Sequence, residues 1–186
     1  MNRRQSLGIL GSWVATLAWA RHGQATTARA VSLPDLVQRS HRIIRGTPVD
    51  SFARAEDVGG ARHIVTYSRL RVEELLEGGP SESEILVRSL GGQLAGVGEI
   101  VHGEAELALA ETSVIFLRTS PDGIEHVTAM AQGYYPLLLG ASAGPRLRAS
   151  RNLPHLVAGA AAGSAVAQLS GVPLDEARSL IRGARR

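Results

Sequence analysis

Ser142 is the one side chain that the sequence places in a familiar catalytic pattern. Residues 140–144 read G-A-S-A-G after an apolar stretch, which matches the G-x-S-x-G pattern of a nucleophile elbow. In that pattern the catalytic residues follow in the order serine, acid, histidine. No acidic residue lies between Ser142 and His155, the last histidine of the chain. A hydrolase that uses Ser142 is therefore an alternative function rather than the preferred one.

His102, Glu104 and Glu106 have the spacing of a metal site or of a general acid and base pair. They lie two residues apart, and on one extended strand their side chains project from the same face. Gly103 interrupts that strand, and a solvated polar edge explains the same residues. A metal-dependent enzyme is thus a second alternative. The sequence carries no cofactor motif, and we predict no cofactor.

Gln132, Tyr134 and Tyr135 are the predicted partner-binding residues. The two tyrosines are adjacent, and the chain beyond residue 25 has only five aromatic residues. Neighbouring side chains on a strand point to opposite faces. We therefore expect one tyrosine in the core and the other exposed, where an amphipathic ring suits a protein interface. The alternative is that both tyrosines are structural.

Residues 1–25 have the layout of a secretory signal. Arg3 and Arg4 precede an apolar run from Leu7 to Ala20, and a polar stretch then ends at Ala25. The run is shorter than the roughly 20 residues that a membrane-spanning helix needs. We expect cleavage after Ala25, export to the periplasm or the cell exterior, and no membrane span. The arginine pair leaves open the general secretory route and the twin-arginine route.

Composition and charge restrict the partners. Beyond residue 25, 17 Arg balance 17 acidic residues, and the chain has no Cys, which excludes disulfides, thiolate metal sites and cysteine nucleophiles. Residues 31–140 carry a net charge of −6, and residues 141–186 carry +5. An acidic domain with few aromatic rings is poorly suited to nucleic acids. We predict no nucleic-acid partner, and a basic C-terminal segment that docks on the acidic part.

The hydrophobic pattern predicts a mainly β chain. A short helix is expected over residues 32–40, with Ser32 as its N-cap and Pro34 in its first turn. Helical periodicity returns near the C-terminus, over residues 153–169 and 174–181. Between these helices, alternation and turn residues predict seven strands, over residues 41–49, 62–76, 84–90, 97–102, 112–119, 124–131 and 134–139.

Short strands without intervening helices predict an antiparallel barrel or sandwich. The long strand expected over residues 62–76 favours a small barrel of the OB type, whose strands must coil to close. We expect a β-barrel domain over residues 26–140. A linker with C-terminal helices, residues 141–186, is expected to pack on this barrel.

Several segments resemble a group of uncharacterised exported bacterial proteins. The segments read IRGTPV (44–49), IVTY (64–67), RVEELLEG (71–78), LGG (90–92), VIFL (114–117) and MAQG (130–133). More distantly, their order is similar to the netrin-like domains that include the tissue inhibitors of metalloproteases, which are OB-type barrels. That resemblance implies the barrel and adds a protease-inhibitor-like role as an alternative. Those inhibitors bind the protease zinc through an N-terminal cysteine, which this chain lacks.

No motif in the sequence assembles a complete set of catalytic groups. We therefore predict an exported, non-catalytic domain that binds a protein or a component of the cell surface. The hydrolase, the metal-dependent enzyme and the inhibitor-like protein are the alternatives.

Overall fold

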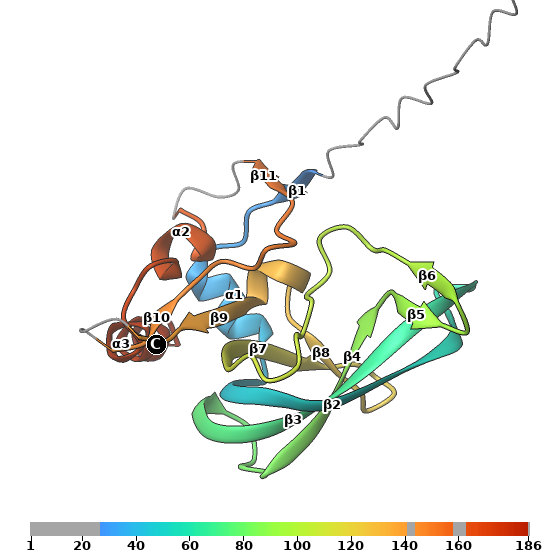
Figure 1. The fold of residues 1–186 in the computed structure, drawn as a ribbon. Helices are drawn as coiled ribbons and strands as arrows, with labels where there is room; N and C mark the ends of the chain where they lie inside the picture. Colours follow the sequence, from blue (N-terminus) through green and yellow to red (C-terminus); the bar gives the residue numbers. More distant parts are fainter. Residues whose placement is uncertain (1–26, 141–143, 158–162, 186) are drawn as a thin grey trace, which may run out of the picture.

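The computed structural model describes residues 27–140, 144–157 and 163–185 (Figure 1). Most of its regular structure is β-strand, which confirms the predicted mainly β chain. The predicted signal, residues 1–25, lies outside the described residues. In chain order the elements are β1 (Thr27–Arg29), α1 (Leu33–Arg39), β2 (Arg42–Val58), β3 (Ala61–Gly78), β4 (Glu84–Leu90), β5 (Gly92–Leu94), β6 (Val97–Glu99), β7 (Ser113–Thr119), β8 (Glu125–Val127), the 3-10 helix η1 (Met130–Gly133), β9 (Tyr134–Leu138), β10 (Arg146–Leu147), β11 (His155–Val157), α2 (Ala165–Leu169) and α3 (Leu174–Ala184).

A seven-stranded mixed sheet forms the centre of the fold, in the order β10-β9-β7-β2-β3-β4-β8. Its neighbours are antiparallel except β4 and β8, which pair in parallel at Val87 and Glu125. Strand β8 also pairs with β7. The pairings β7-β2-β3-β4-β8 therefore return to β7, and these five strands are called the ring below. Register shifts along β2 between residues 43 and 50 bend this strand, as β-bulges do.

Two buried clusters lie on opposite faces of the sheet. The ring core takes side chains from all five ring strands: Ile44, Leu70, Val87, Ile115 and Val127. The second cluster packs the helices α1, α2 and α3 against the other face of β2, β7 and β9. Since both faces of these three strands are covered, adjacent residues on them are both buried.

Helix α1 forms where the sequence predicts it. The Ser32 hydroxyl accepts a hydrogen bond from the Asp35 N–H at 3.2 Å, and a proline occupies the first turn, which satisfies one of the free amides at the helix start. The side chains Leu33, Leu36 and Val37 are buried. They fix α1 on the outer face of the ring, where it contacts α2 and α3.

The C-terminal segment differs from the predicted linker and long helix. Residues 153–169 were expected to be helical, but the described part of this range, residues 153–157 and 163–169, contains the strand β11 and the short helix α2. Pro154 disfavours a helix before it, and β11 pairs in parallel with β1, a partner more than 120 residues away in sequence that local periodicity does not reveal. The segment also adds β10 to the sheet, next to β9.

The basic C-terminal segment docks on acidic residues, as its charge predicts. Arg178 of α3 binds the Glu74 carboxylate of β3 through two nitrogens, at 2.6 and 2.9 Å. Arg148 binds Glu111 at 2.8 Å. Within the described ranges, no helix is long and apolar enough to cross a membrane.

Candidate functional site

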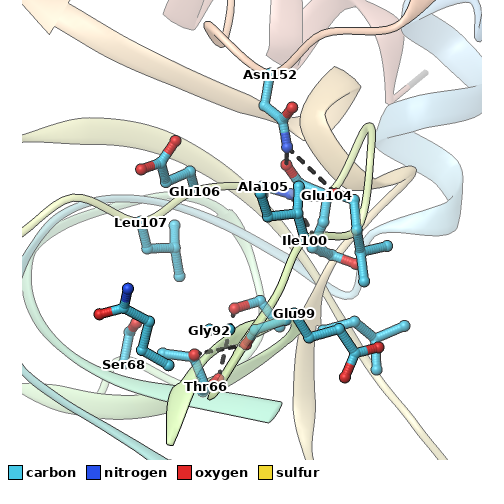
Figure 2. A pocket seen from close by; sticks show the side chains of 16 residues that line it. Thr66, Ser68, Gly92, Glu99, Ile100, Glu104, Ala105, Glu106, Leu107 and Asn152 are labelled. Atoms are coloured by element: carbon cyan, nitrogen blue, oxygen red, sulfur yellow. Dashed lines mark hydrogen bonds between the residues drawn. The ribbon is translucent and has the colours of Figure 1, made fainter. Parts of the chain in front are cut away.

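A cavity of about 490 Å³ lies beside β3 and β4, at the margin of the ring core. Its floor contains Thr66 and Ser68 from β3 and Ser89 from β4. Residues 100, 101 and 104–107 form the opposite wall, across from the floor (Figure 2). The hairpin of β5 and β6 lines a third side. This cavity is called the pocket below.

The three floor hydroxyls lie on the strand face that points into the ring core. Farther along the same face, β3 and β4 carry the fully buried Leu70 and Val87. Thr66 is opposite Ser89 in the strand register. Their hydroxyls donate to main-chain carbonyl oxygens at 2.7 and 3.5 Å. The floor is therefore a polar row that continues an apolar core face.

Glycines bring the hairpin of β5 and β6 close to the floor. Gly92 has a φ of 133°, and a Cβ built on it would lie 2.2 Å from the Thr66 Oγ1. Gly91 has a φ of 90°, and its Cβ would lie 2.8 Å from the Glu99 carbonyl oxygen. Residues with a side chain rarely adopt such positive φ values. Both glycines are thus required for the shape of the pocket.

Glu99 fastens the end of this hairpin to the start of β3. One carboxylate oxygen is 2.6 Å from the His63 Nδ1, and the other accepts a hydrogen bond from the Ile64 N–H at 2.6 Å. The bond to His63, followed by the bond to the Ile64 amide, holds the pKa of Glu99 below its ordinary value. His63 gave no signal in the sequence because its partner lies 36 residues away.

The structure separates the three residues of the predicted metal site. Strand β6 ends at Glu99, short of the strand expected over residues 97–102, and His102, Glu104 and Glu106 do not share one extended strand. Glu104 and Glu106 line the pocket, whereas His102 does not. In the described ranges no group of three or more histidine, aspartate or glutamate side chains is placed to hold a metal ion. The prediction that these three side chains project from one face of a strand was therefore wrong.

Asn152, from the C-terminal segment, fixes the wall that carries Glu104. Its Nδ2 donates to the Glu104 carbonyl at 2.9 Å and to the Val101 carbonyl at 3.4 Å (Figure 2). The Glu104 carboxylate accepts a hydrogen bond from the Ala105 N–H at 3.2 Å. Burial raises the pKa of Glu104 above its ordinary value. The wall thus holds a carboxyl group that is partly shielded from water.

Both tyrosines of the predicted partner site are buried, so the expected exposure of one of them was wrong. Tyr134 belongs to the ring core, and Tyr135 packs edge-on against Phe116 in the second cluster, with ring centres 5.8 Å apart. Gln132 is buried as well. Its side chain accepts a hydrogen bond from the Val31 N–H at 2.9 Å and donates to the Arg29 carbonyl at 3.1 Å. All three residues therefore belong to the packed interior. Tyr135 is buried because helices α1, α2 and α3 pack on the face of β9 that was expected to be exposed.

Ser142, the nucleophile of the hydrolase alternative, lies outside the described residues. His155, its only possible downstream base, is an exposed residue of β11.

Comparison with known protein families finds no family model that matches the chain, and comparison with curated proteins finds no matching sequence. The proposals that follow rest on the geometry and chemistry of the pocket.

Proposed function

We propose that the protein is an exported, non-catalytic binding domain that holds its ligand in the pocket. The observation that carries this proposal is the cavity of about 490 Å³, a volume within the roughly 300–1,000 Å³ that is usual for ligand sites. Its wall combines apolar side chains with a few converging polar groups, as ligand sites do. The ligand is a free small molecule or a group carried by a protein or a component of the cell surface.

We infer further that the ring is a barrel of the OB type. Taken in chain order, β2, β3, β4, β7 and β8 are strands one to five, and their pairings run 1-2-3-5-4-1 with strands three and five parallel. OB-type barrels bind ligands on the face of strands two and three. Here those strands are β3 and β4, which supply the pocket floor. This is an argument from fold-level analogy, and it agrees with the position of the cavity.

The contacts of the lining side chains favour binding over catalysis. The described lining includes no histidine, and no hydrogen bond joins a lining hydroxyl to a lining carboxylate. A nucleophilic hydroxyl needs a base within hydrogen-bond reach. The hydroxyls of Thr66 and Ser89 instead donate to the main chain, which makes them suited to shaping a site.

Export is supported by the arginine pair and the apolar run of residues 1–25. Mass measurement of the protein recovered outside the cytoplasm tests it, with Thr26 as the expected first residue. A form outside the cytoplasm that retains Met1 would contradict the cleavage, and a protein found only in the cytoplasm would contradict the export.

The binding function is tested by NMR with the purified, isotope-labelled protein. A set of neutral, cationic and anionic fragments is titrated, and we expect at least one of them to shift the amides of Gly92, Glu99 and Leu107. The variant Gln93→Trp places a large ring at the exposed rim of the pocket and should abolish these shifts. The matched control Ser51→Trp adds the same ring on an exposed position of β2, away from the lining. Absence of pocket shifts with every fragment would overturn the proposal.

A further inference from the structure

One edge of strand β2 has no neighbouring strand along its second half. Residues 42–46 pair with β3 on one side and with β7 on the other, whereas residues 50–58 pair only with β3. Among the described residues, no main-chain hydrogen bond joins residues 50–58 to a segment other than β3. Such an edge presents a row of free N–H and C=O groups that can pair with a further strand. Residues 50–58 are called the free edge below.

The free edge is regular and accessible. Its register with β3 has no shift from Asp50 to Val58, and it contains no proline. Its side chains are exposed or half-exposed. It lies on the side of the molecule away from the helices α1, α2 and α3 (Figure 1). A partner strand can therefore approach it.

The two faces of the free edge differ. On one face the Phe52 ring stacks on Tyr67, with ring centres 5.3 Å apart, and the Arg54 guanidinium lies 4.5 Å from the centre of the Tyr67 ring. Phe52 is nevertheless 47% exposed. Glu56 lies on the same face and accepts a hydrogen bond from the Tyr67 hydroxyl at 2.8 Å. The other face carries only small side chains at its centre: Ser51, Ala53 and Ala55.

Charge selects the strand that fits this edge. Arg54 and Glu56 have opposite signs, and charged side chains on an edge repel strands that carry the wrong charges. A second copy of the chain that runs antiparallel, with Ala55 opposite Ala55, places each Arg54 opposite Glu56 of the other copy. The same register places each Phe52 opposite Val58. Opposite charges and aromatic rings beside β-branched residues are favourable cross-strand pairs.

Neighbouring registers fit less well. A centre at residue 54 or 56 sets Arg54 or Glu56 against its own copy, and like charges directly opposite each other destabilise a sheet. A centre at residue 53 also opposes two acidic residues. A centre at residue 52 sets Glu56 against Pro48, whose carbonyl already accepts a main-chain hydrogen bond at 2.9 Å. The charges therefore select the register described above.

We propose that two copies of the chain pair antiparallel along their free edges and form a symmetric dimer with one continuous sheet. Each copy contributes the same surface, as the interface of a two-fold dimer requires. Ala53 and the floor residue Thr66 both face Gly92, so the pocket floors of the two copies lie on the same face of the joined sheet. This inference goes beyond the proposed binding function and does not depend on it.

Sedimentation of the purified protein over a range of concentrations tests the dimer. We expect an equilibrium between monomer and dimer at about physiological salt. Hydrogen exchange of the main-chain amides of residues 50–58 should become slower as the concentration rises. A protein that stays monomeric up to about 1 mM would overturn the proposal.

Single cysteines test the register, because the natural chain has none. In Ala55→Cys the two thiols of a dimer lie on directly opposite residues, whose Cβ atoms are about 5 Å apart in a sheet, and a short bis-maleimide should crosslink them. The matched control is Ser51→Cys on the same strand face. Because Ser51 would lie opposite Gly59, the two control thiols would be about 27 Å apart along the strands and should not be crosslinked. Equal crosslinking of the two variants, or none in Ala55→Cys, would overturn the proposal.

Charge reversal tests the pairs across the junction. Arg54→Glu and Glu56→Arg each place like charges opposite each other in a dimer, and each should weaken dimerisation at least about tenfold. An equimolar mixture of the two variants restores opposite charges at both positions and should form dimers about as well as the natural protein. Arg182→Glu makes the same change of net charge as Arg54→Glu at an exposed position of α3 and should leave dimerisation unchanged.

The mixture separates loss of pairing from loss of fold. Circular dichroism of each variant confirms that it is folded, and if a charge variant does not fold, the cysteine variants decide the question. A mixture that dimerises as weakly as the single variants would overturn the proposal. An equal loss in Arg182→Glu would show that dimerisation follows net charge, and would overturn it as well.

Discussion

Arg42 of β2 and Glu125 of β8 form a buried ion pair. The Arg42 Nη2 is 2.8 Å from the Glu125 Oε1, and the two side chains are 7% and 9% exposed. Arg42 begins β2, and Glu125 lies in β8, which pairs with both β4 and β7. The pair therefore links β2 to β8, the strand whose pairings with β4 and β7 close the ring.

Removing one partner of this pair should destabilise the fold strongly. Arg42→Met leaves the Glu125 carboxylate buried without an arginine, beside His41 and the Thr119 hydroxyl, and we expect the free energy of unfolding to fall by about 3 kcal/mol. The double variant Arg42→Met/Glu125→Met should recover most of this loss, because no unpaired charge remains. Arg69 and Asp50 form an exposed pair, and Arg69→Met should cost less than about 1 kcal/mol. Urea denaturation measures the stability of these three variants. Equal losses in Arg42→Met and Arg69→Met would show that the buried pair contributes no more than the exposed one.

The contact of Glu99 with His63 and Ile64 makes the pocket hairpin sensitive to acid. The pKa of Glu99 is lowered in the folded protein, first by the hydrogen bond to His63 and then by the Ile64 amide. Its contribution to stability is therefore present above the ordinary glutamate pKa of 4.5 and is lost as the pH falls through the lower, folded value.

We expect Glu99→Gln to be less stable than the natural protein near neutral pH and to approach it at acidic pH. Denaturation between about pH 3 and pH 7 measures this difference. Amide exchange should also become faster in the hairpin of residues 92–99. Glu84→Gln, an exposed acid without an ion pair, is the control and should leave hairpin exchange unchanged. Unchanged exchange in Glu99→Gln would show that the carboxylate does not hold the hairpin.

The sequence predicts the elements of the ring better than it predicts what covers them. Local alternation and turns indicate β3, β4 and β7, and the cap at Ser32 indicates α1. The sequence gives no local sign that α1, α2 and α3 cover the outer face of β9. The exposure of one tyrosine was therefore mispredicted, since strand alternation says which side a residue faces but not whether that side is buried.

The pocket was missed for a similar reason, although one signal was present. Thr66 and Ser68 are polar residues at the positions of β3 that continue the apolar face of Leu70. Polar residues on a core-facing row indicate a site or a buried hydrogen-bond network. The opposite wall has no such signal, because residues 100–107 are irregular. Asn152, which holds that wall, lies 48 residues from Glu104.

The adjacent tyrosines of β9 should respond in opposite directions to loss of their hydroxyl. The Tyr134 hydroxyl donates to the Glu111 Oε2 at 3.3 Å, so Tyr134→Phe should lower the free energy of unfolding by about 1 kcal/mol. The Tyr135 hydroxyl is buried and has no partner among the described residues. Tyr135→Phe should therefore leave stability unchanged or raise it by up to about 1 kcal/mol. Thermal and urea denaturation of the two variants decide it, and an equal loss in both would reveal a partner for Tyr135.

Gly92 is the position where the pocket is most sensitive to a single methyl group. In Gly92→Ala the new Cβ would lie 2.2 Å from the Thr66 Oγ1, on a backbone with a φ of 133°. The hairpin must then move away from the floor, and we expect a loss of about 2 kcal/mol in unfolding free energy together with weaker ligand binding. Gly98→Ala is the matched control on the same hairpin, because its nearest neighbour, the Gln93 Cγ, would lie at 3.8 Å. It should leave the unfolding free energy unchanged.

A second substitution separates the steric clash at Gly92 from the backbone strain. Thr66→Ala removes the Oγ1, and the next nearest atom to the new Cβ of Gly92→Ala is then the Cβ of residue 66 at 3.6 Å, an ordinary contact. We therefore expect the double variant Gly92→Ala/Thr66→Ala to lose less unfolding free energy than the sum of the losses of the two single variants. The loss that remains comes from the positive φ at residue 92. Urea denaturation of the four proteins gives this coupling energy. If the two losses simply add, the hairpin does not contact the Thr66 hydroxyl at Gly92, and Thr66 does not limit how closely the hairpin approaches the pocket floor.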